Sequence, residues 1–490
     1  MVHLHPTLDL STEEQMELGK YTIDQICHYL EHTDEVNVSP ELNPTEIVQY
    51  AEQIDFHNPV TPKEAVHYIV EGLRRYQVHT AHPGYYGLFN PRPNFMGIVA
   101  DAITAAFNPQ LAVWSHAPLA VEIENYVLRE FAVRFGYPRE TSNGTFTTGG
   151  AEANLTAVLT ALCDHFPEYT TKGLASLDKP PVMYASSESH HSLVKAARAC
   201  GLGTDSIRSI RSNASLQMDA EALALQIQQD REAGFAPFLI VATAGTTGAG
   251  AIDPIADIAE LAEQEMIWLH VDAAYGGAMI LAPELSNWLQ GINRADSITF
   301  DAHKWLSVPM GAGMYFTRHP HILQQTFRMT ADYMPKEGTE LETFDPYTHS
   351  IQWSRRFIGL KLYMSLATAG WEGYRLLVRR QIERGNFLRQ ELERSGWSIM
   401  NDTIMPVVCF NEQAALANHD LDFVRFIHEK VLATGKAWIS IFTIRDTPAL
   451  RACITNFDTT EQHMIELIHL LNAARQEYMT KIPSYNGMIY

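Results

Sequence analysis

A lysine stands in an unusual setting in the stretch DAHKW, residues 301–305, between the apolar run DSITF and the segment LSVPMGAGMYF. A lysine in a buried sheet must be paired, or its amine must take part in chemistry. Burial favours the neutral form of an amine and prepares it for Schiff-base formation with an aldehyde. Lys304 is therefore a candidate nucleophile, although a structural ion pair explains it equally well at this point.

Two further segments carry residues that suit a phosphorylated, aromatic ligand. In TTGGAEANLTA, Gly149, Gly150 and Ala151 precede a helical pattern, and the free N–H groups of a helix start would receive a phosphate. In YASSESHHSLVKAARA, His190 and His191 lie at a strand-to-helix junction. Each signal also has an ordinary explanation, because glycine turns punctuate many chains and histidines often lie at helix starts.

A buried carboxylate completes the set. The segment MIWLHVDAAYGG reads as an apolar strand that ends in Asp272, followed by the small residues Ala273 and Ala274. Such a carboxylate needs a cationic or hydrogen-bonding partner, and the alanines leave room for something flat, although a helix-capping aspartate is the alternative. A phosphate seat, a ring-stacking histidine, an aspartate for a pyridinium nitrogen and a lysine able to form an aldimine are what pyridoxal 5'-phosphate (PLP) requires.

The elements that must position these residues follow from periodicity. Between about residues 95 and 315, β-branched runs such as PVMYASS, PFLIVATA and SITFDA alternate with helical segments, which predicts a mostly parallel sheet with helices on both faces. In such α/β sheets, ligands bind beyond the carboxyl ends of the strands, where all four segments lie. Residues 11–32 open with a capping signature and predict an amphipathic helix, and the region from 371 reads as a smaller α+β domain.

Composition excludes several other classes of protein. The chain has 490 residues and a formal net charge of -21, which argues against nucleic acid or an anionic membrane surface as partner. Its five cysteines lack C-x-x-C spacing, so neither a metal site nor a disulfide framework is predicted. The N-terminus lacks a basic region before an apolar core, and no run of about 18 uncharged apolar residues occurs. We therefore expect a cytoplasmic protein.

The motifs resemble, in order along most of the chain, those of the group II PLP-dependent amino-acid decarboxylases, which act on aromatic amino acids, glutamate or diaminobutyrate. The matching stretches are HPGYYGLFN, SHAPLAVEIE, TTGGAEAN, SHHSLVKAA, AGTTGAGAID, HVDAAYGG, DAHKW and QWSRRF. The resemblance implies an α/β fold of the PLP-dependent transferase type, fold type I, and an intertwined homodimer. It divides the chain into an N-terminal helical dimerisation segment (1–80), a large PLP-binding domain (81–370) and a small C-terminal α+β domain (371–490).

The resemblance also implies roles for individual residues. Lys304 would form the aldimine, Asp272 would hold the pyridinium nitrogen, Ala274 would lie beneath the ring, and His191, rather than His190, would stack over it. The remaining predicted cofactor contacts lie in the phosphate neighbourhood: Gly150, Ala151, Thr247, His303 and Asp301. Asp301 stands where asparagine is common, and its role is open because an ionised carboxylate cannot donate a hydrogen bond.

The implied reaction is decarboxylation of an L-amino acid to its amine and CO2. Tyr333, in the polar segment after Lys304, matches the tyrosine that donates a proton from a mobile loop in the resembled family. The predicted substrate contacts are His82, Tyr85, Tyr86 and Phe89, whose aromatic surface favours an aromatic substrate, with acidic or diamino acids behind it.

Two other functions stay open at this stage. One is oxygen-dependent decarboxylation with deamination to an aldehyde, which in the resembled fold is associated with phenylalanine at the position of Tyr333. The other is a scaffold that keeps the fold without catalysis, against which Lys304, Asp272 and His191 argue.

Overall fold

A seven-stranded sheet lies at the centre of the described residues, in the order β1-β7-β6-β5-β4-β2-β3. The computed structural model describes residues 9–329, 345–413, 415 and 420–481. The strands of this sheet are β1 (Asn143–Thr147), β2 (Pro181–Ser186), β3 (Ile207–Ile210), β4 (Ala236–Thr243), β5 (Trp268–Asp272), β6 (Ser297–Asp301) and β7 (Gly313–Thr317).

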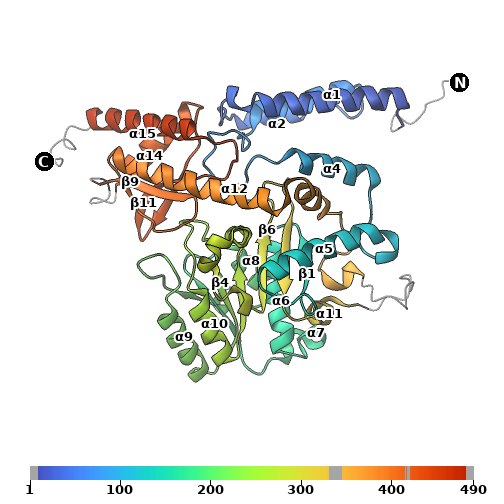
Figure 1. The fold of residues 1–490 in the computed structure, drawn as a ribbon, viewed down its shortest axis with the longest axis vertical. Coiled ribbons are helices and arrows are strands. Elements are labelled where there is room, and N and C mark those ends of the chain that lie inside the picture. Colours follow the sequence, from blue (N-terminus) through green and yellow to red (C-terminus); the bar gives the residue numbers. More distant parts are fainter. Residues whose placement is uncertain (1–8, 330–344, 414, 416–419, 482–490) are drawn as a thin grey trace.

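The sheet is mostly parallel, as predicted. Strands β3, β2, β4, β5 and β6 run parallel to one another, whereas β7 is antiparallel to both β6 and β1. Strand β4, APFLIVAT, is buried after its first residue, as expected for a parallel strand that is covered on both faces. The sheet forms the lower body of the molecule in Figure 1.

Helices cover both faces of this sheet. One face packs against α6, α8 and α11, and the other against α5, α9 and α10. The helices are α1 (Thr12–Glu31), α2 (Pro44–Ala51), α3 (Pro62–Tyr76), α4 (Phe95–Phe107), α5 (Pro118–Arg134), α6 (Gly150–His165), α7 (Tyr169–Lys172), α8 (Ser192–Ala199), α9 (Ala220–Glu232), α10 (Ile255–Glu265), α11 (Ile322–Phe327), α12 (Leu360–Arg394), α14 (Leu421–Ala433) and α15 (Glu461–Lys481).

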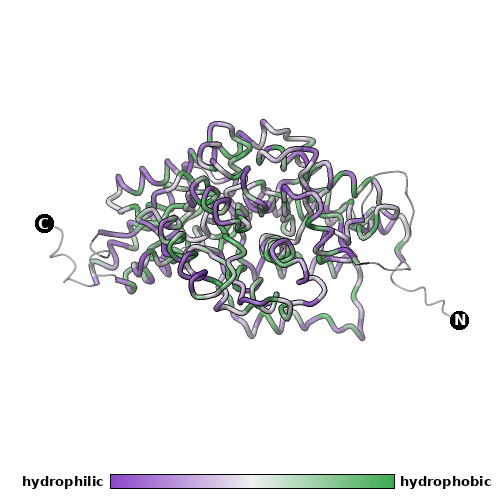
Figure 2. The backbone as a smooth tube through the Cα atoms, turned by 90° about the horizontal axis from the view of Figure 1, so that it is seen from below, coloured by the Kyte–Doolittle hydropathy of each residue, from purple (hydrophilic) through white to green (hydrophobic). Residues whose placement is uncertain are grey.

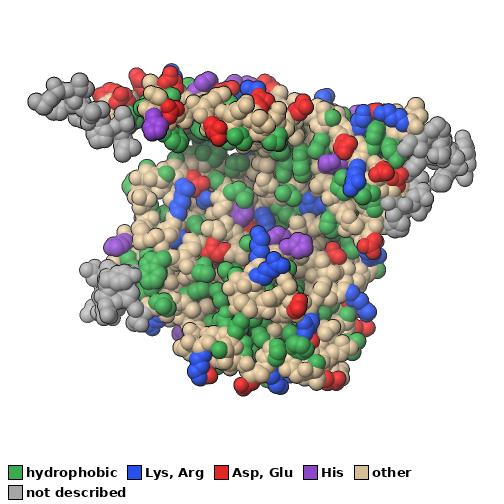
Figure 3. Space-filling view, turned by 180° about the vertical axis from the view of Figure 1, so that it is seen from behind, with side chains coloured by type: hydrophobic (Ala, Val, Ile, Leu, Met, Phe, Trp, Pro, Cys, Tyr) green, Lys and Arg blue, Asp and Glu red, His purple; other side chains and the backbone are tan. Residues whose placement is uncertain are grey.

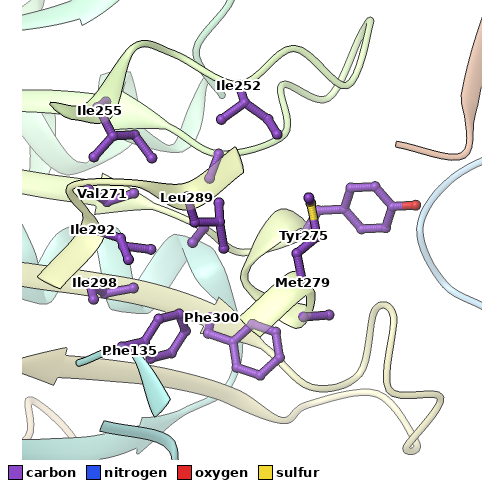
Figure 4. Close-up of a cluster of buried hydrophobic side chains, with 14 of the residues drawn as sticks. Phe135, Ile252, Ile255, Val271, Tyr275, Met279, Leu289, Ile292, Ile298 and Phe300 are labelled. Carbon is purple, nitrogen blue, oxygen red and sulfur yellow. The ribbon is translucent and has the colours of Figure 1, made fainter. Parts of the chain in front are cut away.

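The packing around β5 and β6 is dense. Figure 4 shows Val271 from β5 and Ile298 and Phe300 from β6 within one cluster of buried side chains. The ring of Phe300 meets that of Phe135 edge to face, with centroids 6.0 Å apart. Because a closely packed interior deforms little, the residues at the carboxyl ends of β5 and β6 are held in fixed positions.

A second, antiparallel sheet belongs to the C-terminal region, in the order β10-β11-β9-β8. Its strands are β8 (Trp397–Ile399), β9 (Val407–Glu412), β10 (Ser440–Ile444) and β11 (Thr447–Cys453). It shares a hydrophobic core with α14, α15 and the last turns of α12, which confirms the predicted small α+β unit. The predicted division at 80/81 and 370/371 stays a prediction, since α12 runs across the second boundary with a non-helical Gly370 (φ 64°).

The N-terminal helices form a separate layer beside the main body. Helix α1 begins at the predicted capping box, in which Ser11 and Glu14 bond each other's backbone N–H groups, and it packs on α3 without burying any residue. In Figure 2 hydrophilic and hydrophobic positions are interleaved along the whole backbone, and the N-terminal helices have no other layer above them in Figure 1. Large apolar side chains are therefore left exposed, among them Ile69 (55%) and Leu73 (52%). Among the described helices, none has the length and apolar character to cross a bilayer.

Candidate active site

The candidate residues converge at one edge of the central sheet. Asp272 is the last residue of β5, Asp301 is the last residue of β6, and β1 ends at Thr147 just before the glycine turn. Lys304 follows Asp301 in a tight turn, in which the backbone N–H of Lys304 donates to the carbonyl of Asp301 at 3.2 Å. The sheet thus brings together, at the carboxyl ends of neighbouring strands, residues that are about 30 to 150 positions apart in the sequence.

The amine of Lys304 is paired with a buried carboxylate. Lys304 Nζ lies 3.1 Å from Asp301 Oδ2, and the Asp301 side chain is only 2% exposed. The other oxygen, Asp301 Oδ1, lacks a hydrogen-bond partner among the described residues. A buried oxygen with a free lone pair is costly in a finished structure and suits a site that receives a ligand group.

Two glycines allow the chain to pass close to Asp301. A Cβ on Gly150 would come within 2.9 Å of Asp301 Oδ2, and a Cβ on Gly313 within 2.5 Å of Thr147 Oγ1 and 2.8 Å of Asp301 Oδ1. A side chain at either position would clash with these atoms, so glycine is required at both. The start of α6 therefore lies close against the end of β6, and the phosphate seat there stays a prediction.

Asp272 is held by hydrogen bonds on both oxygens. The backbone N–H of Ala274 donates to Oδ1 at 3.1 Å, and Asn154 Nδ2 donates to Oδ2 at 2.8 Å. The two donors fix the orientation of the carboxylate, which is 6% exposed. Ala274 is also buried, with a side chain that ends at Cβ, so the space in front of Asp272 is free of bulky groups.

Behind Asp272 lies a buried polar network that sequence reasoning missed. Asn154 Oδ1 accepts from Thr299 Oγ1 at 2.9 Å and lies 3.1 Å from His270 Nε2, and His270 Nδ1 lies 2.8 Å from Ser297 Oγ. Full burial lowers the pKa of His270 to about 4, so the ring is neutral near pH 7. His270 precedes Asp272 by two positions in β5 and so points to the same face of the sheet, which is the signal that could have found it.

The adjacent histidines at the start of α8 differ in their surroundings. Desolvation lowers the pKa of His190, and the charges of Asp272, Lys304 and Asp301 all act on it, so His190 lies close to the candidate site. Its Nδ1 accepts the N–H of Ser192 at 3.2 Å, which fixes the ring. The prediction that His191 stacks over the ring stays a prediction, and the electrostatics add His190 as a second candidate.

The other predicted phosphate contacts differ in their burial. His303 is buried, its Nδ1 accepts the N–H of Ala312 at 3.2 Å, and desolvation lowers its pKa. Ala151 is exposed in the first turn of α6, and Thr247 is exposed in the loop after β4. Their contacts with phosphate stay predictions.

Most residues of the segment HPGYYGLFN are buried. Desolvation lowers the pKa of His82 to about 4, and His82 Nδ1 accepts the N–H of Gly84 at 2.8 Å. Phe89 stacks on Tyr275 with ring centroids 3.9 Å apart, and the Tyr85 ring lies 5.3 Å from that of Trp438. The substrate contacts predicted for His82, Tyr85 and Phe89 stay predictions.

Tyr86 has a different environment. It is fully buried within the core of the small C-terminal unit, next to side chains from α12, α14 and β9. This burial argues against a direct substrate contact by Tyr86 and favours a packing role.

One buried arginine connects this segment to the loop after β4. Arg451, 3% exposed, donates to the carbonyls of Gly248 at 2.8 Å, Gly87 at 2.9 Å and Thr247 at 2.7 Å. Its guanidinium also lies over the ring of Phe89, at 5.2 Å from the centroid. Sequence reasoning missed this residue, because a single arginine in the short strand TPALRAC carries no chemical signal of its own.

The described residues fit PLP. The helix start at Gly150, which has no side-chain cap, offers backbone N–H groups to an anion. Asp272 is an acceptor for a pyridinium N–H, and the amine of Lys304, paired with Asp301, is a nucleophile for an aldehyde. Figure 3 shows histidine and basic side chains gathered near the centre of the recessed face below the N-terminal helices. Tyr333, the predicted proton donor, lies outside the described residues.

Comparison with known proteins defines the class. The family model "Pyridoxal-dependent decarboxylase conserved domain" matches residues 50–413. A curated relative, aromatic-L-amino-acid decarboxylase of Bacillus atrophaeus, is 29% identical over 486 residues, which cover 97% of this chain and 98% of the relative.

Solved structures share the fold over nearly the whole chain. Oryza sativa TDC with PLP and tryptamine matches with a TM-score of 0.91 and 24% identity, covering 97% of this chain and 99% of that one. Rhodiola rosea 4-hydroxyphenylacetaldehyde synthase matches with a TM-score of 0.87 and 23% identity, covering 96% and 99%. The fold is therefore fold type I, as predicted. The chain belongs to the pyridoxal-dependent decarboxylase family, and it is a PLP-dependent carboxy-lyase that acts on an amino acid.

Proposed function

We propose that this enzyme decarboxylates an aromatic L-amino acid to the corresponding amine and CO2, with Lys304 as the covalent anchor of PLP. The observation that carries the proposal is the pairing of Lys304 with Asp301 beside Asp272 at the carboxyl ends of β5 and β6. The aromatic preference is supported by the name of the Bacillus atrophaeus relative and by the aromatic side chains of Tyr85 and Phe89 near the site.

The bound PLP would supply a ring that accepts the electron pair released as CO2 leaves. In this proposal Lys304 would hold the cofactor aldehyde through its amine. Asp272, fixed by two hydrogen bonds, would accept the hydrogen bond of a protonated ring nitrogen and so favour the charged ring. His190 or His191 would cover the ring and exclude water, and Tyr333 would return a proton to the substrate carbon.

The experiment is a panel of L-amino acids, both aromatic and acidic or diamino, incubated with the PLP-loaded enzyme while CO2, amine and hydrogen peroxide are measured. We expect the aromatic substrates to yield one amine per CO2 and no peroxide. An exclusive preference for glutamate or diaminobutyrate would overturn the substrate proposal. One peroxide per CO2 would overturn the simple decarboxylase and indicate the aldehyde-forming reaction.

We also propose that the enzyme works as a homodimer in the cytoplasm, where its five free cysteines would stay reduced. The support for the dimer is the N-terminal layer, whose groove is lined by Ile26, Tyr29, Leu30, Val70, Leu73 and Ile98. Apolar surface of this kind, left uncovered on a helix pair, favours association with a second chain.

Substitutions on α3 test the dimer. Ile69→Asp and Leu73→Asp place charges on exposed apolar positions, so the molar mass from light scattering should fall from two chains to one. Glu71→Gln on the same helix is the control and should stay dimeric. A monomeric wild type would overturn this part of the proposal.

A further inference from the structure

We propose that Asn154 and His270 are positioning residues, which hold Asp272 in the correct orientation through a directed chain of hydrogen bonds that begins at Trp268. The inference rests on the proposed function, because it assumes that Asp272 binds the pyridinium nitrogen of PLP. It concerns residues on three elements, α6, β5 and β6, that reach one another only in the folded sheet.

The first link fixes the amide of Asn154. An ionised carboxylate oxygen only accepts hydrogen bonds, so the atom of Asn154 that lies 2.8 Å from Asp272 Oδ2 must be the amide nitrogen. The same nitrogen donates its second hydrogen to Ser192 Oγ at 2.9 Å. The amide oxygen therefore faces away from Asp272, toward β5 and β6.

The second link fixes the tautomer of His270. Asn154 Oδ1 lies 3.1 Å from His270 Nε2, and two acceptors cannot face each other at that distance without a hydrogen between them. The proton of the neutral ring must therefore be on Nε2. Thr299 Oγ1 donates to the same amide oxygen at 2.9 Å, so both lone pairs of Asn154 Oδ1 are used.

The third link sets the far end of the chain. With Nε2 protonated, His270 Nδ1 must accept, and Ser297 Oγ at 2.8 Å is the donor. Ser297 Oγ in turn accepts from Trp268 Nε1 at 2.9 Å. Indole is a donor only and the carboxylate is an acceptor only, so a chain between them runs in one direction, from Trp268 through Ser297, His270 and Asn154 to Asp272.

The direction of the chain has a chemical consequence. Each hydrogen-bonding group presents its positive end toward Asp272, and hydrogen bonds in series polarise one another in a medium of low dielectric constant. His270, Ser297 and Thr299 are fully buried, so water cannot replace a missing link. Loss of His270 Nε2–H would remove one of the two donors to Asn154 Oδ1 and so weaken the hold on the amide that faces Asp272.

The experiment compares matched substitutions in the full-length enzyme. His270→Phe removes both ring nitrogens, whereas His270→Gln can place an amide N–H near the position of Nε2; Asn154→Ala removes the donor itself. Two readouts are used: the dissociation constant of PLP from the apoenzyme, measured by protein fluorescence, and the solid-state 15N NMR signal of PLP labelled at the ring nitrogen. Asp272→Asn is the reference. The control is Tyr184→Phe on β2, which removes a buried hydroxyl that is hydrogen-bonded to Asp230.

We expect Asn154→Ala and His270→Phe to weaken PLP binding by roughly tenfold to hundredfold, the range for loss of a hydrogen bond to a charged group. They should also shift the ring-nitrogen signal from the protonated toward the unprotonated form. His270→Gln should stay within about threefold of the wild type, a residual of less than one ordinary hydrogen bond, and Tyr184→Phe should change neither readout.

The outcomes separate this inference from the proposed function. An unchanged ring-nitrogen signal in Asp272→Asn would overturn the role of Asp272 itself. A changed signal in Asp272→Asn, combined with wild-type behaviour of Asn154→Ala and His270→Phe, would overturn only the positioning role. Near-ultraviolet circular dichroism checks folding. If His270→Phe fails to fold, Trp268→Phe, at the start of the hydrogen-bond chain, takes its place. We expect this variant to shift both readouts by a smaller amount, and the absence of any shift would overturn the proposal.

Discussion

The amine of Lys304 lies 3.1 Å from Asp301 Oδ2, and this pairing determines what must happen before the amine can react. Attack on an aldehyde requires the lone pair of a neutral amine, so the contact between Lys304 and Asp301 must be released or rearranged before Lys304 can react.

The anchoring role of Lys304 has a direct test. Lys304→Ala should still bind PLP through the remaining contacts, but treatment with borohydride should leave no covalently bound cofactor, because among the described lysines this is the amine that lies at the candidate site. Peptide mass spectrometry of the reduced wild type and variant checks this. The exposed Lys195→Ala is the control and should keep the adduct. A cofactor-labelled peptide that contains any other lysine would refute the assignment.

Residue type determined which members of the site could be predicted from the sequence. Lys304 and Asp272 could be singled out because a charged group in an apolar run needs a reason. Asn154 could not, because a polar residue inside a helix pattern does not reveal its partner, and its partners Asp272 and His270 lie more than 110 positions away. His270 could have been found only from its alternation with Asp272 along β5. The order of elements was predictable from periodicity, whereas contacts across the sheet depend on strand order, which periodicity does not determine.

At the scale of elements, the loop after β4 depends on the small C-terminal unit. A Cβ on Gly248 would lie 1.9 Å from Phe442 Cζ on β10, and Arg451 on β11 donates to the carbonyls of Thr247 and Gly248. The loop that carries Thr247 is thus shaped from outside the large domain.

The substitution Gly248→Ala tests this dependence. The added methyl group must push either the loop or the Phe442 ring aside, so we expect the affinity for PLP to fall by about tenfold, the equivalent of about 1.4 kcal/mol. The double variant Gly248→Ala/Phe442→Ala provides the space again and should restore most of the affinity, measured by fluorescence titration. If the double variant binds no better than the single one, the effect does not pass through this contact.

At the scale of the whole molecule, several histidines are buried in neutral form. Burial lowers the pKa of His82, His270 and His349 to about 4 each, from the ordinary value of 6.5. The unfolded chain therefore binds more protons than the folded one as the pH falls below 6.5. The stability that depends on the neutral rings is fully present above pH 6.5 and is lost as the pH falls toward 4, by on the order of 3 kcal/mol for each fully buried ring.

The corresponding measurement is urea unfolding between pH 7.5 and 4.5. We expect the free energy of unfolding of the wild type to fall over this range, and that of His270→Gln to fall less steeply, by about one proton or 1.4 kcal/mol per pH unit at most. The comparison between the two proteins cancels the contribution of the carboxylates. Parallel curves would show that His270 is not buried as a neutral ring.

The bridge made by Arg451 also bears on how the protein is made. Gly87, Thr247 and Gly248 leave the ribosome hundreds of residues before Arg451, whose guanidinium joins their carbonyls. A nascent chain therefore contains all the cofactor motifs recognised in the sequence well before Arg451 can fix the loop after β4. PLP capture should follow the completion of translation, and a message truncated just ahead of residue 447 should give a polypeptide that contains Lys304 and Asp272 yet retains no cofactor.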